Sequence, residues 1–323
     1  MRHIASVFAA LAALLLLAAP GRAQQSYPDK PVRMVVPWPP GGSVDIVARL
    51  VSEKLGQRLA QPIIIQNSSG ASGTIGMDMV AKARPDGYTL LINTIPLATN
   101  PALFAQLPFD TVKDFAPIAL IAKMPHLLVS TQAITVGDMR ELLNLAKSRP
   151  GRLTYSSAGS GSTTHLSALL FSTMSRTDIL HIPYRGGGPA LADAVSGQVD
   201  ISFPSFAAAL PFVKTGRIKA LAITSASRSP LMPDRPTGAE AGLPGYEFTA
   251  WFMLRAPAAT PRDIVGRVNQ AVTETMKSPD VAERFAREGT EIVSGTPDRA
   301  AAFLAAEIGQ WAQVIKERGI KMD

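Results

Sequence analysis

The chain has 323 residues, no cysteine and a formal net charge of +7 at pH 7. The lack of cysteine excludes disulfides, thiolate metal sites and a cysteine nucleophile. The basic residues are scattered singly with few aromatic residues among them, so the sequence predicts no nucleic-acid surface. The length predicts about two domains.

The first residues predict an export signal. Arg2 and His3 precede an apolar run at 4–18 that is too short for a membrane span. Gly21-Arg22-Ala23 then offers small residues at the two positions that a signal peptidase reads. We expect residues 1–23 to be cleaved off and the mature protein to reach the periplasm. The alternative, an uncleaved anchor, is disfavoured because polar residues without a basic cluster follow.

Strand and helix patterns alternate along the rest of the chain, as is typical of an α/β fold. The first part predicts a strand at 32–36, an amphipathic helix from 43 and a second strand at 63–65. A short helix that ends at about 83 and a third strand at 88–93 follow. Two strand-like pieces then occupy 118–130, divided at 123–125.

The same alternation restarts after this division. We expect a helix capped by Thr135, a strand at 153–157, a helix that ends near 174, a strand at 179–182 and a helix that ends near 195. Strands at 199–203 and 218–224 then flank a further helix. Residues 225–245 are predicted to be irregular. A strand at 248–254 and three helical pieces follow, the last at about 297–318.

This order predicts two α/β units. The chain leaves the first unit near residues 123–125 and returns to it near 246–251, so the C-terminal helices belong to the first unit. The predicted lobes are therefore 27–123 with 250–323, and 124–249. Two crossings between lobes make a hinge with a cleft.

Enzymatic and metal-binding residue patterns are weak. His126, His165 and His181 occur singly, which predicts no metal site. Ser160 and Ser162 lie in a strand-to-helix loop, but neither fits the G-x-S-x-G pattern of a nucleophile elbow. We expect His165 to bond a nearby carbonyl, and we predict no catalytic residue and no cofactor. An exported hydrolase that uses Ser160 or Ser162 is the alternative.

Four loops rich in Gly, Ser, Thr and Asn each follow a predicted strand and precede a predicted helix, at 37–43, 67–73, 158–163 and 184–188. Ligands of open α/β sheets bind at this end of the strands. Helix N-termini attract anions through unpaired N–H groups. No lysine follows Gly41 and Gly42, unlike a nucleotide-binding P-loop. Each loop alone could be an ordinary turn, but four in two lobes predict one composite anion site.

Several single residues allow two interpretations. Asp45 is expected to serve the helix dipole and loop amides more than a ligand. Trp38 either walls the pocket or covers the sheet edge. Arg185 is a carboxylate clamp or a solvated or interlobe residue. Trp251 is predicted to be a core residue, and Asp200 either meets a ligand or caps a neighbour.

At these residues the chain resembles the TctC/Bug-type family, the exported substrate receptors of tripartite tricarboxylate transporters. The matching segments include P-W-P-P-G-G-S-V-D-I-V-A-R, N-S-S-G-A-S-G-T-I-G, A-R-P-D-G-Y-T-L-L, Y-S-S-A-G-S-G-S-T-T-H-L-S-A and P-Y-R-G-G-G-P-A-L-A-D. The resemblance covers essentially all of 27–323. It implies a type II-like, two-lobed periplasmic-binding-protein (Venus flytrap) fold that closes on a small carboxylate.

The resemblance also implies a ligand site gripped by one loop from each lobe. The implied residues are Trp38, Pro40, Gly41, Gly42, Ser43, Asp45 as a support, Asn67, Gly70, Thr94, Gly159, Ser160, Ser162, Thr163, Tyr184, Arg185, Gly186 and Ser205. Ser160 departs from the family, which usually has asparagine there, and F-P-S-F at 203–206 suggests a more apolar pocket end.

Together these features predict a monomeric periplasmic receptor that binds a small organic acid and delivers it to membrane transporter subunits. The predicted partners are therefore the acid and the transporter, with no nucleic acid. The alternative is a receptor that presents its ligand to a sensor system.

Overall fold

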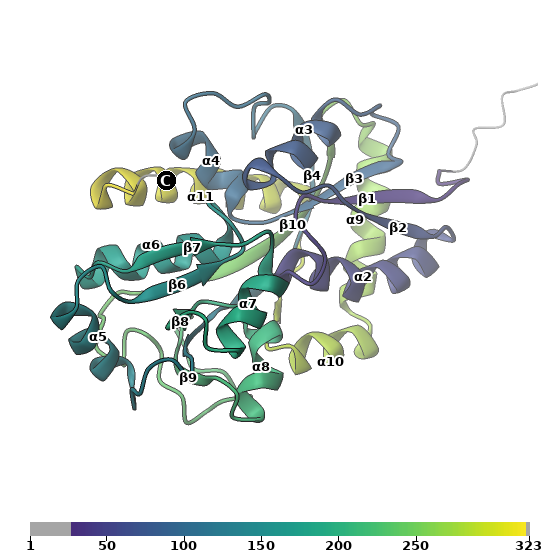
Figure 1. Cartoon of the computed structure of the whole chain (residues 1–323). Helices are drawn as coiled ribbons and strands as arrows, with labels where there is room; N and C mark the ends of the chain where they lie inside the picture. The colour runs from purple at the N-terminus through teal and green to yellow at the C-terminus, as the bar shows by residue number, and fades with distance from the viewer. Residues whose placement is uncertain (1–26, 321–323) are drawn as a thin grey trace, which may run out of the picture.

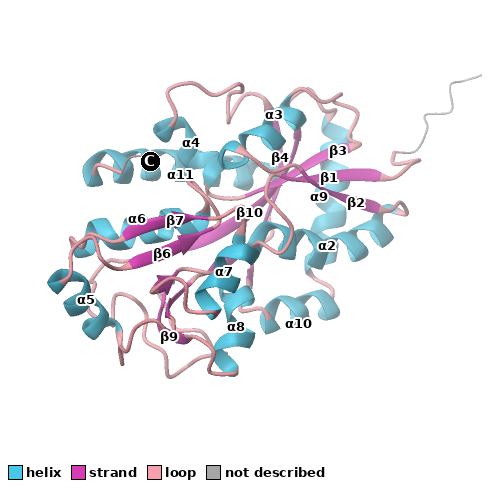
Figure 2. Cartoon of the chain, in the orientation of Figure 1, coloured by secondary structure: helices cyan, strands magenta, loops and turns pink. Residues whose placement is uncertain are grey.

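Two β-sheets form the centres of two lobes in the computed structural model, which describes residues 27–320 (Figure 1). Helices pack around both sheets (Figure 2). No helix within the described range is long and apolar enough to cross a bilayer. The predicted export signal at 1–23 lies outside the described residues.

The first sheet has six strands in the order β11-β4-β10-β3-β1-β2. Their bounds are β1 (Val32–Val36), β2 (Ile63–Asn67), β3 (Thr89–Asn93), β4 (Phe115–Pro125), β10 (Thr249–Pro257) and β11 (Glu291–Ile292). Strand β1 pairs in parallel with both β2 and β3, so the loops after these three strands share one edge of the sheet. Strand β10 runs antiparallel to β3 and β4.

The helices of this lobe bury their apolar faces on the first sheet and on one another. They are α2 (Ser43–Leu59), the 3₁₀ turn η1 (Ala71–Gly73), α3 (Thr74–Ala81), α4 (Pro96–Leu103), α9 (Arg262–Met276), α10 (Pro279–Arg287) and α11 (Pro297–Arg318). On α2, the residues Val47, Val51 and Leu55 are buried at helical spacing. The predicted amphipathic helix from Ser43 is thus confirmed.

The second sheet has five strands in the order β7-β6-β8-β5-β9. Their bounds are β5 (Leu127–Ser130), β6 (Thr154–Ser157), β7 (Leu180–Pro183), β8 (Ile201–Ser202) and β9 (Lys219–Ile223), and the helices are α5 (Met139–Ser148), α6 (Thr163–Ser175), α7 (Gly187–Val195) and α8 (Phe206–Lys214). Strand β6 pairs in parallel with β7 and β8, so the loops after these strands also share one edge.

Three predicted features differ from the structure. The helix expected from Thr135 begins at Met139, because Asp138 accepts a hydrogen bond from the Glu141 N–H at 2.9 Å and so caps it. The strand break expected at 123–125 lies at His126, since Pro125 is tolerated as the last residue of β4. Helix α4 was not predicted, because its two prolines are typical of a loop.

The chain passes between the two sheets twice. Strand β4 ends at Pro125 and β5 begins at Leu127, and the chain returns from β9 through the irregular segment 224–248 to β10. The two sheets and the two connections between them give the molecule two lobes, as predicted. The lobe boundaries at 123/124 and 249/250 stay a prediction.

His126 occupies the first crossing and is fully buried. Its ring packs on Phe248 with the centroids 5.0 Å apart, and its main-chain N–H donates to Thr224 Oγ1 at 2.8 Å. Neither ring nitrogen has a hydrogen-bond partner among the described residues. Burial lowers the pKa of His126 to about 3. The folded protein therefore holds this ring neutral.

We predict that His126 makes the folded state sensitive to acid. Its folded pKa lies below the unfolded value of about 6.5, so its contribution to stability is complete above that pH and is lost as the pH falls towards 3. Between pH 8 and pH 5 the free energy of unfolding should fall by about 2 kcal/mol more in the wild type than in His126→Phe, which keeps an aromatic ring. Urea unfolding at both pH values measures this, and equal losses in the two proteins would contradict it.

Candidate functional site

The loops that follow the parallel strands of the two sheets face each other across a cavity of about 50 Å³. The first lobe contributes residues after β1 and β3, and the second contributes residues at the ends of β6 and β8 and at the starts of α6, α7 and α8. The lining residues are Trp38, Pro39, Gly41, Gly42, Ser43, Val44 and Thr94 from the first lobe, and Ser156, Ser157, Ala158, Ser162, Thr163, Thr164, Gly186, Gly187, Ala190, Leu191, Ser202, Pro204, Ser205 and Ala208 from the second.

The cavity receives its positive potential from helix ends. None of the described residues that line it has an ionisable side chain. The N-cap residues of α2, α6, α7 and α8 all line it, namely Gly42, Ser162, Gly186 and Ser205. In α2, α7 and α8 no side chain caps the first turn. Their N–H groups are thus available to an anion.

Thr94 adds a hydroxyl to this cavity at the end of β3. The residue is only 1% exposed, and its Oγ1 has no hydrogen-bond partner among the described residues. Buried hydroxyls in folded proteins are nearly always paired. Thr94 therefore contributes an unpaired buried hydroxyl to the wall of the cavity.

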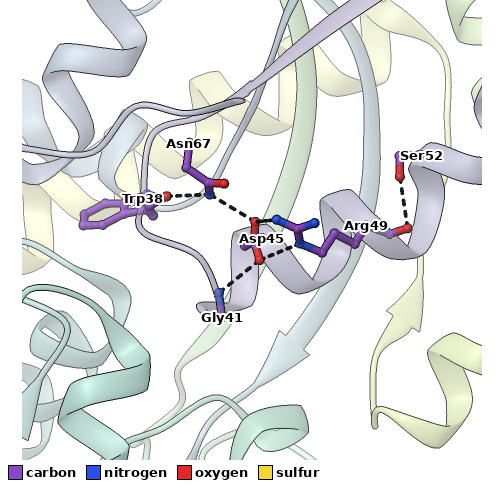
Figure 3. Close-up of polar contacts among 6 residues, drawn as sticks. All are labelled: Trp38, Gly41, Asp45, Arg49, Ser52 and Asn67. Atoms are coloured by element: carbon purple, nitrogen blue, oxygen red, sulfur yellow. Dashed lines mark hydrogen bonds and ion pairs between the residues drawn. The ribbon is translucent and has the colours of Figure 1, made fainter. Parts of the chain in front are cut away.

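The loop after β1 is braced from behind by Asp45, which is buried in the first turn of α2 (Figure 3). Its carboxylate accepts hydrogen bonds from the Gly41 N–H at 3.0 Å, from Arg49 at 2.9 and 3.1 Å, and from Asn67 Nδ2 at 3.0 Å. Asn67 Nδ2 also donates to the Trp38 carbonyl at 2.9 Å. Burial raises the pKa of Asp45, but the hydrogen bonds outweigh it and hold the pKa below its usual range. Arg49 neutralises the carboxylate, so it does not oppose an anion in the cavity.

The two lobes touch beside the cavity. The Ser72 hydroxyl of the first lobe donates to the Ser160 carbonyl of the second at 2.7 Å. A Cβ added to Gly186 would lie 2.9 Å from Pro39 Cβ. The structure therefore has the loops of the two lobes in direct contact.

The structure sorts the predicted ligand residues into three groups. Nine line the cavity, namely Trp38, Gly41, Gly42, Ser43, Thr94, Ser162, Thr163, Gly186 and Ser205. A neighbouring hollow, which shares Trp38 and Gly186, is lined by Gly70, Gly159, Ser160, Tyr184 and Arg185. Pro40, Asp45 and Asn67 line neither hollow. Ligand contact by any of these residues stays a prediction.

The structure shows the surroundings of the residues for which the sequence allowed two interpretations. Trp38 lines both hollows, and Arg185 lines the neighbouring one, where it is exposed. Trp251 is a core residue, as predicted, and its Nε1 donates to Glu307 at 2.7 Å. Asp200 accepts from the N–H and hydroxyl of Thr154 at 2.7 and 2.8 Å, which is the local capping role.

In the loop with Ser160 and Ser162, the contacts of Ser162 and His165 hold the start of helix α6. Ser162 Oγ accepts from the main-chain N–H of His165 at 3.3 Å and so caps α6. The ring Nδ1 of His165 accepts from the Gly161 N–H at 2.9 Å, where we expected it to bond a carbonyl. These contacts stabilise the loop. Among the described residues no group of three His, Asp or Glu side chains could hold a metal ion.

Sequence reasoning missed the lining residues that lie inside regular elements. Ser156, Ser157 and Ser202 end strands, and Leu191 and Ala208 lie in helices that begin at the cavity. Ser156 and Ser157 directly precede a loop that was predicted to contact the ligand. Their position next to that loop is a sequence signal that could have identified them as lining residues. The helical residues show no such signal, because their direction depends on how the helices pack.

Comparison with known proteins now identifies the family. A profile described as "Tripartite tricarboxylate transporter family receptor" matches residues 47–320. The chain belongs to this family. The resemblance stated from the sequence is therefore confirmed.

Solved structures of relatives share the whole fold of this receptor. The structure of R. palustris Rpa4515 with adipate is 37% identical and has a TM-score of 0.88, covering 91% of this chain and 99% of that one. MatC (Rpa3494) from Rhodopseudomonas palustris with bound malate is 37% identical, with a TM-score of 0.85 and coverage of 90% and 100%. The periplasmic binding protein BugD is 31% identical, with a TM-score of 0.88 and coverage of 91% and 99%.

We predict that Asp45→Ala destabilises the receptor, because it removes the buried carboxylate that accepts hydrogen bonds from Gly41, Arg49 and Asn67. The free energy of unfolding should fall by about 2–3 kcal/mol. The matched control is Glu283→Ala, which removes the exposed pair of Glu283 with Arg287 at the same i,i+4 spacing. That change should cost no more than about 0.5 kcal/mol. Urea unfolding compares them, and equal effects would contradict the bracing role.

We predict that Gly186→Ala weakens ligand binding, because the new Cβ meets Pro39 and Gly186 has a φ of +118°. An overpacking cost of about 1–3 kcal/mol in the free energy of binding corresponds to roughly 5- to 150-fold weaker binding. Gly188→Ala is the control, since its Cβ meets nothing within 4 Å. Calorimetric titration with adipate measures both variants. Unchanged affinity in Gly186→Ala would show that the lobes bind without approaching this closely.

Proposed function

We propose that this receptor binds a small organic acid in the cavity between its lobes and delivers it to the membrane subunits of a tripartite tricarboxylate-type transporter. It acts in the periplasm after cleavage behind Ala23, and it binds its ligand without transforming it. The family membership supports a receptor role, and two related proteins, Rpa4515 and MatC, were solved with adipate and with malate.

The observation that carries this proposal is the convergence of helix N-termini on a cavity without a cationic side chain. Three of these termini, those of α2, α7 and α8, have no side-chain cap. A carboxylate that enters the cavity loses hydration and gains charge-assisted hydrogen bonds from main-chain N–H groups, which are stronger than neutral ones. A neutral ligand would leave the positive helix ends uncompensated.

The buried hydroxyl of Thr94 supports the same conclusion. It gives the first lobe a side-chain donor opposite Thr163 and Ser205 of the second lobe, all three of which line the cavity. A small acid that touches both lobes links them. We propose that 27–123 with 250–323 moves against 124–249 about the two crossings when the ligand enters or leaves.

Gly42→Val tests the main-chain cradle. Gly42 has a φ of −80°, and an added Cβ would meet only the Pro39 carbonyl oxygen, at 3.7 Å, so the fold accepts a side chain here. The valine would occupy the space through which a carboxylate reaches the α2 amides. The loss of two charge-assisted hydrogen bonds predicts about 100-fold weaker binding.

Calorimetric titrations with adipate and malate measure this change. The matched control is Gly266→Val on the exposed side of α9, where a Cβ meets nothing within 4 Å. Wild-type protein that binds neither acid nor any other carboxylate in a thermal-shift screen would refute the proposed ligand class. Copurification with a sensor's extracellular domain in place of an integral membrane partner would refute delivery to a transporter.

A further inference from the structure

Ser157, which was not among the predicted site residues, is hydrogen-bonded to a histidine at the wall of the cavity. It ends β6, lines the cavity and has its Oγ 2.6 Å from Nε2 of His181 on the neighbouring strand β7. Ser157 Oγ also accepts the Gly159 N–H at 3.1 Å. The function proposed above makes no use of this pair.

The imidazole of His181 is held in place by stacked rings. Its centroid lies 4.9 Å from that of Tyr155, with 14° between the planes, and 4.1 Å from that of His165, with 16°. His165 is in turn bonded to the binding loop through the Gly161 N–H. The stack places the His181 ring beside Ser157.

The direction of the hydrogen bond between Ser157 and His181 decides whether Ser157 offers a proton or a lone pair to the cavity. A serine hydroxyl has one proton and two lone pairs. One lone pair of Ser157 accepts from Gly159, which leaves a proton and a lone pair for His181 and the cavity. If Nε2 accepts, the hydroxyl proton goes to His181 and the cavity faces a lone pair. If Nε2–H donates, the hydroxyl proton is available to a ligand.

We propose that His181 is a positioning residue for ligand recognition, which donates through Nε2–H to Ser157 Oγ and thereby turns the Ser157 O–H towards a ligand oxygen. This inference rests on the proposed function for one step, namely that the ligand group in the cavity is an anion. A lone pair of Ser157 would repel a carboxylate, whereas its O–H would add a charge-assisted hydrogen bond to those of the helix ends. Ser157 is then a side-chain donor on the second lobe.

A double-mutant cycle with adipate tests whether His181 acts through Ser157. One charge-assisted hydrogen bond predicts roughly ten-fold weaker binding for Ser157→Ala and for His181→Leu alone. The double variant should bind as Ser157→Ala does, because the hydroxyl that His181 directs is already gone. His181→Gln, whose amide can still donate, should recover most of the affinity. Additive losses, or no recovery by glutamine, would overturn the proposal, and thermal unfolding of each variant separates lost folding from lost binding.

The protonation of His181 provides a test that needs no ligand. In ¹⁵N-labelled wild-type protein the imidazole nitrogens report which one carries the proton, and His181→Gln assigns the signals. We expect Nε2 of His181 to be protonated, with and without adipate. A neutral ring with its proton on Nδ1 would overturn the assignment even if adipate binds. Failure of the wild type to bind any carboxylate would instead refute the proposed function and leave this protonation measurable.

Discussion

Several helix N-termini share one small cavity, and this crowding of like partial charges constrains the rest of the molecule. Each terminus presents unpaired N–H groups, and the lining offers no carboxylate to compensate them. The arrangement follows from topology, because in each sheet the parallel strands end at one edge, and a helix begins directly after each of β1, β6 and β7. Two such edges facing each other concentrate partial positive charge at one cavity.

The loops that form this site are held by polar groups on the side away from the cavity. The Asp45 carboxylate accepts hydrogen bonds from Gly41, Arg49 and Asn67, and the Arg49 guanidinium neutralises its negative charge. In the second lobe, His165 accepts the Gly161 N–H. Fixing the loops from behind leaves little reorganisation for the binding that we propose.

The junction between the lobes combines a buried crossing with contacts beside the cavity. His126 is buried and neutral at the first crossing, while beside the cavity the Ser72 hydroxyl contacts the Ser160 carbonyl and Gly186 lies close to Pro39. The crossing is therefore part of the core, whereas the contacts beside the cavity are made by residues of loops and helix starts. This contrast suits the lobe movement that we propose, because the contacts beside the cavity can separate without disturbing the core.

The sequence by itself determined the alternation of strands and helices, the Gly-rich loops, the family and most of the residues at the helix starts, since these depend on local patterning and turn chemistry. It could not predict helix α4, because Pro101 in the interior disfavours a helix and tertiary packing overrides this preference, whereas Pro96 suits the first turn. The support of the loop by Asp45 was predicted and is confirmed by its contact with the Gly41 N–H. The sequence could not tell that Asn67 stands behind the loop and Ser160 beside the cavity, or that Ser157 meets His181. Those relations join residues from different strands and lobes, and only the pairing register of β6 with β7 and the approach of the two lobes decide them.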